Sequence, residues 1–301
     1  MDNFTDRLIK LGKEKNSRVI FELVPSEGSI PSFYGEKYES LGARLFAYGI
    51  DVIKNVKDLV PAIMLSRAAF EFYGIDGIMA FSMLTHYAAE AEIPVIIDGC
   101  FGGTGDDILK YAGSCFYTGA GVQDNRWYAD AITVSPYAGS EVLKKLARLC
   151  DEEGKAAFLV ARPSGSGAED DVENVKTGDG ETLYEVAFDD AGAFGEPYIG
   201  ENGYSVLGTM TVPQPDLIKL RGVDRWGIAL VCAKPADVDK EYTYDLFYPG
   251  EGEGEFLVLS ENDVVAELGT GTADAETIAG LLEKLVKKSE DSAAPGLPAP
   301  T

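Results

Sequence analysis

Residues 95–105 combine the pattern of a buried strand with groups that could do chemistry. Three apolar residues lead into Asp98, and the chain continues as Gly-Cys-Phe-Gly-Gly-Thr-Gly. In a barrel of alternating strands and helices, catalytic groups sit where strands end. There Asp98 could act as a base or an electrostatic group and Cys100 as a nucleophile, while the glycine-rich turn could hold an anion through backbone N–H groups. The motif predicts a candidate active site.

Other reactive residue types are sparse in this chain. The four cysteines, Cys100, Cys115, Cys150 and Cys232, form no CxxC pair, and His86 is the single histidine. Zinc sites need clustered Cys and His ligands, so we expect no zinc site. His86 lies within a predicted helix, which leaves Cys100 without an evident base for nucleophilic catalysis.

Apolar runs of strand length alternate about eight times with helical patterns. The expected strands are 18–24, 62–68, 94–99, 129–135, 155–162, 204–210, 226–232 and 255–260, and the expected helices are 36–56, 69–90, 106–117, 140–153, 183–193, 213–220 and 273–288. Several strands are apolar on consecutive residues, as in sheets covered on both faces. The pattern predicts a single-domain α/β protein, a (β/α)8 TIM-type barrel over residues 1–288.

Long acidic connections are expected at 165–181, 190–203 and 237–254, the last of which carries four aromatic residues. Long loops in compact domains are functional or flexible. The Pro/Ala-rich segment 289–301 is predicted to be a disordered tail.

The charge balance limits the classes of partner. Fifty acidic residues face 26 basic ones, giving a net charge of −24. Such a chain is unsuited to nucleic acid, whose binding depends on basic groups that meet phosphates. No stretch approaches about 18 uncharged apolar residues, so we expect no membrane span. The first residues are charged and amphipathic without the apolar core of a signal peptide, which predicts a cytoplasmic protein.

Several segments resemble orotidine 5′-monophosphate decarboxylases of the longer bacterial type. They are residues 1–10, 59–62, 69–74, 93–98 and, most specifically, 129–140 with the sequence Ala-Asp-Ala-Ile-Thr-Val-Ser-Pro-Tyr-Ala-Gly-Ser. The resemblance extends over about residues 1–190. It implies a TIM-type barrel, in most members a homodimer, with a carboxy-lyase activity of pyrimidine biosynthesis that uses no metal or cofactor. The implied ligand is a nucleotide or another small anion.

The positions that carry chemistry in that family are mostly substituted here. The resemblance places Asp98 at a retained catalytic aspartate, Cys100 at the proton-donating lysine and Gly103 at a second aspartate. Met64 stands at the lysine that ends the second strand. A thiol with an ordinary pKa of about 8.5 is neutral or anionic near pH 7, so Cys100 cannot replace a cation.

The ligand-binding positions are kept only in part. Thr133 and Ser135 correspond to the strand that contacts the pyrimidine, and Arg162 and Arg67 are candidate anion ligands. The arginine that grips the phosphate in the family is absent, and Glu261 stands beside its place.

Three functions remain open at this stage. The chain is a decarboxylase-like protein that is inactive or severely impaired, a different enzyme or anion-binding protein using the same face of the barrel, or an interaction or regulatory pseudoenzyme.

Overall fold

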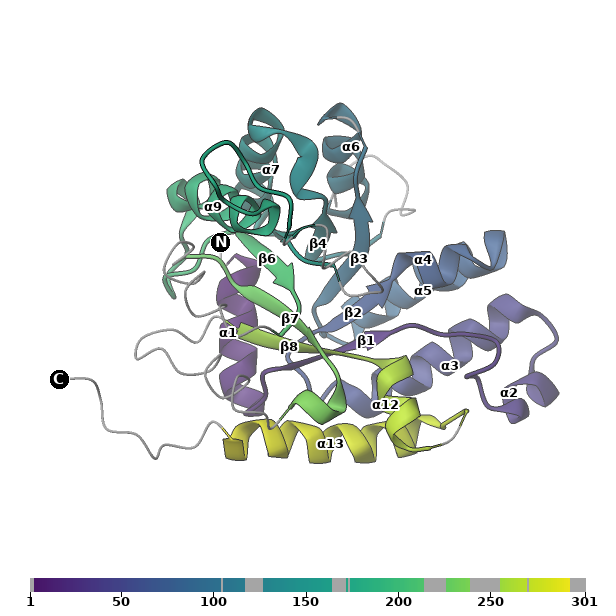
Figure 1. Ribbon diagram of the computed structural model, residues 1–301. Helices are drawn as coiled ribbons and strands as arrows, with labels where there is room; N and C mark the ends of the chain where they lie inside the picture. The colour runs from purple at the N-terminus through teal and green to yellow at the C-terminus, as the bar shows by residue number, and fades with distance from the viewer. Residues whose placement is uncertain are drawn as a thin grey trace.

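Eight parallel strands close into a barrel in which each strand pairs with its neighbour in the chain and β8 pairs with β1 (Figure 1). The computed structural model describes residues 3–103, 105–116, 127–163, 172, 174–213, 226–238, 255–269 and 271–292. The strands are β1 (Val19–Leu23), β2 (Ile63–Ser66), β3 (Val95–Phe101), β4 (Ala131–Val134), β5 (Ala156–Val160), β6 (Leu207–Thr211), β7 (Ala229–Ala233) and β8 (Glu255–Ser260). The predicted (β/α)8 barrel is confirmed.

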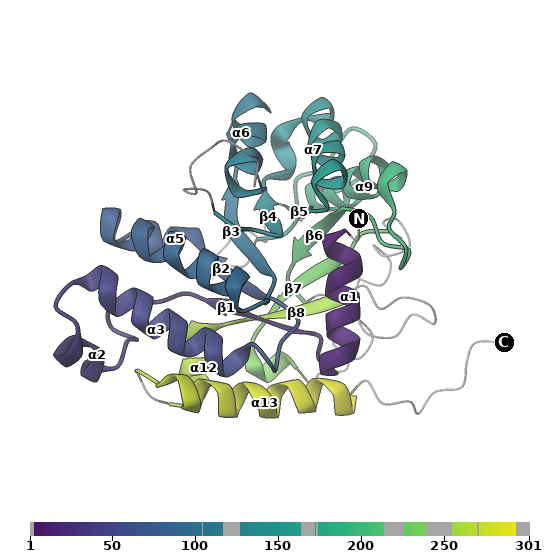
Figure 2. The ribbon, with the colours of Figure 1, turned by 180° about the vertical axis from the view of Figure 1, so that it is seen from behind.

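Helices surround the barrel, as the alternation predicts (Figures 1 and 2). The α-helices are α1 (Phe4–Lys15), α2 (Ser32–Lys37), α3 (Leu41–Val56), α4 (Arg67–Glu71), α5 (Gly74–Glu90), α6 (Gly105–Phe116), α7 (Ser140–Glu153), α9 (Leu183–Gly195), α12 (Glu261–Glu267) and α13 (Ala275–Ser292). Three short 3-10 helices are η1 (Pro136–Ala138), η2 (Glu196–Tyr198) and η3 (Pro235–Asp237). None of the described helices combines the length and apolar character needed to cross a membrane.

Apolar side chains fill the barrel interior, and α1 covers the end where the strands begin. Phe4 and Leu8 of α1 are fully buried and belong to the same cluster as Ile20, Ile96 and Phe158 inside the barrel. A second cluster lies between the strands and the outer helices. The buried contacts of α1 thus cover the barrel at the amino-terminal ends of its strands.

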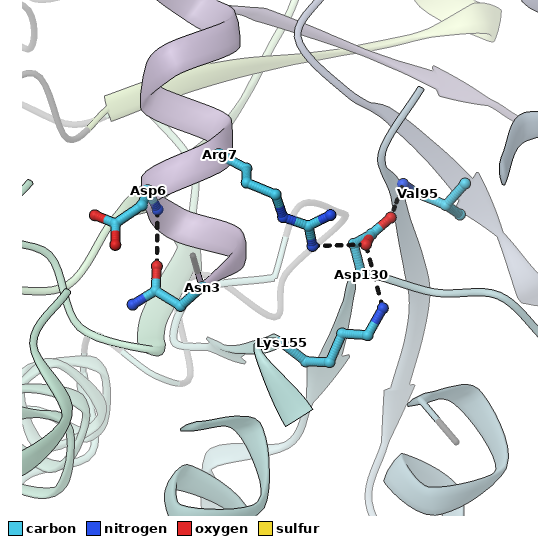
Figure 3. A network of polar contacts seen from close by, with 6 residues as sticks. All are labelled: Asn3, Asp6, Arg7, Val95, Asp130 and Lys155. Atoms are coloured by element: carbon cyan, nitrogen blue, oxygen red, sulfur yellow. Dashed lines mark hydrogen bonds and ion pairs between the residues drawn. The ribbon is translucent and has the colours of Figure 1, made fainter. Parts of the chain in front are cut away.

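A polar network fixes α1 to the barrel (Figure 3). Arg7 on α1 and Lys155 before β5 both bind Asp130 Oδ1, at 2.8 Å and 3.2 Å, while the backbone N–H of Val95 donates to Asp130 Oδ2 at 3.0 Å. Asp6 accepts hydrogen bonds from the backbone N–H groups of Glu201 and Asn202. The network joins the first helix to the starts of β3, β4 and β5 and to the segment before β6.

Two predicted helices are each divided in the structure. Residues 36–56 form the end of α2 and α3, because Tyr38 is extended and Ser40 begins α3 as an N-cap that accepts from the N–H of Ala43. Residues 69–90 form parts of α4 and α5, because Gly74 takes a left-handed φ of 61° that ends helical geometry. Glycine adopts this conformation without steric cost.

Other boundaries also differ from the prediction. The expected connection 190–203 is partly helical, because α9 continues to Gly195 and η2 follows it. The final helix ends at Ser292, four residues beyond the predicted end at 288. The predicted helix 213–220, most of the connections 165–181 and 237–254, and tail residues 293–301 lie outside the described residues.

Candidate functional site

The mouth of the barrel carries a layer of two carboxyl groups, a thiol and a valine. Alternate strands of a TIM barrel contribute four inward-facing side chains to each layer. The strand register places Glu22 of β1, Asp98 of β3, Val160 of β5 and Cys232 of β7 at one level. All four are partly buried, so the layer forms the floor that a ligand entering the barrel would meet.

The hydroxyl group of Thr133 holds the carboxyl group of Asp98. The Thr133 hydroxyl donates to Asp98 Oδ1 at 2.7 Å and accepts from the N–H groups of Gly99 and Cys100, at 3.1 Å and 2.8 Å. The register of β3 shifts between Ile97 and Phe101, and Cys100 has a left-handed φ of 38°. The fully buried Thr133 thus stabilises both the bulge and the orientation of the Asp98 carboxyl group.

The electrostatics of this layer favour neutral acids. Burial raises the pKa of Glu22 from 4.5 to about 8, with further contributions from the charges of Asp98, Asp263 and Glu261. Burial also raises the pKa of Asp98, which the Thr133 hydrogen bond partly offsets. In the part of the chain that the structure describes, no lysine or arginine contributes to either pKa.

The two thiols near Asp98 are poorly suited to nucleophilic attack. Burial and then the charge of Asp98 raise the pKa of Cys100, and burial with the charges of Glu22, Asp98 and Asp263 raises that of Cys232. A thiol reacts as its thiolate, so both cysteines are held in the less reactive form near pH 7. His86, on α5, lies edge-on to the ring of Tyr128, with the ring centroids 4.5 Å apart.

A second buried acid lies where β8 meets α12. Glu261 is fully buried and accepts hydrogen bonds from the backbone N–H of Val24 at 2.9 Å and from the Tyr48 hydroxyl at 2.5 Å. Burial raises the pKa of Glu261 to about 7, and the hydrogen bonds from Tyr48 and Val24 limit the rise. The N–H of Val24, which could otherwise contact a ligand anion beyond β1, already has an internal acceptor.

Met64 and Gly103, which the resemblance gives as substituted catalytic positions, lie at different heights relative to Asp98. Met64 is fully buried one level below Asp98, paired in register with Ile96, whereas Ser66 pairs with Asp98 itself. Gly103 follows β3, and a Cβ atom there would lie 2.6 Å from the Phe101 ring. An aspartate at position 103 would therefore require Phe101 to move.

Three other residues were predicted to bind a ligand: Ser135, Arg67 and Arg162. Ser135, two residues after Thr133, accepts a hydrogen bond from the N–H of Tyr137 at the start of η1. Arg67 bonds Glu71 at 2.5 Å and lies over the rings of Tyr111 and Trp127, outside the strand layer. Arg162 lies 6.0 Å from the Tyr184 ring centroid. An anion at Arg67 would have to compete with Glu71.

Sequence reasoning missed Glu22, Cys232 and the internal role of Glu261. Glu22 has a recognisable signal, since it is an acid two residues after Ile20 and therefore on the inward face of an otherwise apolar strand. Among the described residues, no group of three or more His, Cys, Asp or Glu side chains is arranged to hold a metal ion.

The fold and the site define the class of protein. It is a (β/α)8 barrel protein with an acid at the end of its third strand and its candidate site at the carboxyl ends of the strands. No family model matches the chain. An orotidine 5′-phosphate decarboxylase of Clostridium perfringens is 27% identical over 195 residues, 65% of this chain and 65% of that protein, so the match spans just under two thirds of the relative.

Two further comparisons agree with this relationship. An orotidine 5′-phosphate decarboxylase of Caldicellulosiruptor bescii is 28% identical over 232 residues, 73% of this chain and 75% of that protein. The solved structure of Leishmania donovani OMP decarboxylase superposes with a TM-score of 0.67 at 24% identity, over 94% of this chain and 98% of the other. The chain is thus similar to orotidine 5′-phosphate decarboxylases in sequence, and to a solved member of that family in fold.

Proposed function

We propose that this chain is a member of the family that does not decarboxylate orotidine 5′-monophosphate, or does so at a severely reduced rate, and that its barrel serves binding or interaction. The observation that carries the proposal is the mouth layer, in which Glu22 and Asp98 stand with a thiol and a valine. The reaction implied by the resemblance needs an ammonium group that neutralises developing negative charge and supplies a proton.

The same layer opposes the charge of the substrate. At an effective dielectric constant of about 20, a substrate carboxylate about 5 Å from an ionised Asp98 is repelled by roughly 3 kcal/mol. No lysine or arginine of the described residues contributes to the pKa of Asp98, where one would offset that repulsion. Such a penalty weakens binding by about 100-fold. We therefore expect uridine 5′-monophosphate, which lacks the carboxylate, to bind more tightly than orotidine 5′-monophosphate.

The test is a turnover assay on the purified full chain with orotidine 5′-monophosphate, following the loss of substrate absorbance. We expect no turnover above background, and about one turnover per second, an ordinary enzymatic rate, would overturn the proposal. Asp98→Asn is the matched control, because residual turnover that survives this change comes from a contaminating enzyme. Calorimetric titration with the two nucleotides tests the predicted order of affinities.

A second candidate, proton transfer on an uncharged or cationic ligand, is favoured by the Glu22–Asp98 pair. The protonated Glu22 could donate a proton while Asp98, held by Thr133, accepts one. A thermal-shift comparison of uridine, its monophosphate and the diamine putrescine separates the candidates. A rise in Tm with putrescine that Asp98→Asn abolishes supports this function, and no rise counts against it.

We also propose that the chain forms a homodimer, as the family resemblance implies. Exposed apolar side chains along α5 support this part of the proposal.

A further inference from the structure

A tight turn before β6 carries an asparagine that is followed by a glycine. Asn202 precedes Gly203, and none of the other six asparagines of the chain has a glycine after it. The backbone N–H of Gly200 donates to the carbonyl group of Tyr204 at 2.8 Å, and Gly203 takes a left-handed φ of 84°. Asn202 is exposed in this turn, so water reaches it.

An asparagine before a glycine can lose ammonia without an enzyme, and asparagine is among the thermolabile residues of proteins. The backbone nitrogen of Gly203 forms a bond to Cγ of Asn202, the Cγ–Nδ2 bond breaks, and the proton of the Gly203 N–H leaves with the ammonia. Water then opens the five-membered succinimide ring, so residue 202 becomes aspartate or isoaspartate. Glycine favours the attack because it has no Cβ atom to crowd its nitrogen. The net reaction consumes one water molecule and releases one ammonia molecule.

Both reacting groups are restrained in the folded protein. Oδ1 of Asp6 accepts hydrogen bonds from the backbone N–H and from Nδ2 of Asn202, at 2.8 Å and 3.1 Å, and Oδ2 accepts from the N–H of Glu201 at 3.0 Å. The N–H of Gly203 donates to the carbonyl group of Gly200 at 3.1 Å. The Asn202 side chain must leave Asp6, and the Gly203 N–H must leave its acceptor, before the nitrogen can reach Cγ.

The position of Asp6 depends on α1. Asp6 is 6% exposed, and its backbone N–H donates at 2.8 Å to Oδ1 of Asn3, the residue that caps the helix. Figure 3 shows the side chains of Asp6 and Arg7 leaving α1 on different sides, with Arg7 directed to Asp130. Release of the Asn202 side chain is therefore linked to movement of α1.

Deamidation would place a second carboxylate against Asp6. Asn202 donates to Asp6 through Nδ2, whereas an ionised aspartate has no donor in its side chain. Two carboxylates in contact repel each other, and Asp6 is too buried for water to screen this repulsion fully. Phe4 and Leu8 on the same helix are fully buried, so a loosened α1 exposes apolar surface.

We propose that Asn202 is a site of spontaneous deamidation that Asp6 protects while α1 is docked, and that the aspartate formed there weakens the attachment of α1. Water is the only co-reactant. The reaction rate follows the fraction of molecules in which α1 or the turn has opened. The modification lies at the end of the barrel where the strands begin, so it requires no ligand at the mouth.

The experiment follows residue 202 of the full chain by peptide mass spectrometry during incubation at about 37 °C and pH 8. We expect deamidation at least about tenfold slower than in a free peptide of residues 199–205, because only the opened fraction reacts. Asp6→Ala should react at least about fivefold faster than the wild type, because the hydrogen bonds to a charged group that close the turn are lost. Lys10→Ala removes an exposed side chain from the same helix and should react at the wild-type rate. Circular dichroism verifies that each variant is folded.

A second pair of variants tests the consequence for α1. Asn202→Asp reproduces the product, and Asn202→Ala removes the same side-chain hydrogen bond without adding charge. We expect the Tm of Asn202→Asp to lie at least about 2 °C below that of Asn202→Ala. Deamidation of the wild type at the rate of the peptide, or of Asp6→Ala at the rate of the wild type, would overturn the protection by Asp6. Equal Tm values for the two variants would overturn the effect on α1.

Discussion

Protonation of Glu22 should make the stability of the barrel depend on pH, and Glu22→Gln tests this. The pKa of Glu22 is raised from 4.5 to about 8 in the folded protein. Between these values the folded state binds a proton that the unfolded chain releases. The corresponding stability is therefore fully present below about pH 4.5 and is lost as the pH rises towards 8.

The magnitude follows from the same shift. A rise of about 3.5 pKa units corresponds to at most about 5 kcal/mol. Asp98 and Glu261 also have raised pKa values, and the repulsion among these acids is shared between them. We therefore expect Glu22 itself to account for about 2–3 kcal/mol of the pH-dependent stability. Glutamine cannot ionise. Glu22→Gln should match the wild type within about 1 kcal/mol at pH 5 and exceed its stability by about 2–3 kcal/mol at pH 9.

Urea unfolding at pH 5, 7 and 9, followed by circular dichroism, measures the difference. Glu36→Gln, an exposed position on α2, removes the same charge from the surface and should leave the pH dependence of stability unchanged. If Glu22→Gln and the wild type lose stability equally between pH 5 and pH 9, Glu22 is not the buried acid described above.

Three further predictions concern the other polar contacts. Thr133→Val leaves the N–H groups of Gly99 and Cys100 without their acceptor and should lower the free energy of unfolding in urea by about 2–4 kcal/mol. Thr133→Ser keeps a hydroxyl group and should retain most of the lost free energy of unfolding. If the free energy of unfolding of Thr133→Val equals that of the wild type, the proposed role of the hydroxyl group is contradicted. Asp130→Ala leaves Arg7, Lys155 and the Val95 N–H without their shared acceptor and should lower the free energy of unfolding, measured by thermal unfolding, by about 2–3 kcal/mol. The control Asp151→Ala removes an exposed carboxylate and should change the stability little. Equal losses of stability in the two variants would refute the importance of the network. Cys100 should react with iodoacetamide at pH 7 more slowly than free cysteine, because its pKa is raised. Cys100→Ser identifies the share of the labelling that belongs to Cys100, and a reaction faster than that of free cysteine would favour a nucleophile.

The barrel could be predicted from sequence because its evidence is repeated along the chain. All eight strands occur within or beside apolar runs, and α7 begins and ends at the predicted residues. The division between α4 and α5 was not predicted, because Phe72, Tyr73 and Ile75 continue the apolar pattern across the left-handed Gly74. Periodicity reports burial, whereas the break depends on one backbone angle.

The candidate site was predictable only near Asp98. Its position at a strand end and the adjacent glycines are local signals, and Thr133 was also identified from its own strand. That Thr133 bonds to Asp98, and that Glu22 and Cys232 share its layer, depends on register between strands far apart in the chain. A single sequence contains no direct record of that register.

The attachment of α1 has a consequence for the order of folding during synthesis. Asp6 bonds to Glu201 and Asn202, 195 and 196 residues later in the chain, and Arg7 bonds to Asp130, 123 residues later. At about 5–20 residues per second, a ribosome needs roughly 10–40 s to make the chain between these partners. Throughout that interval Phe4 and Leu8 have no completed barrel to cover. Helix α1 is thus made before every strand of the barrel, yet its contacts can be completed only after residues 201 and 202, shortly before β6, have been made.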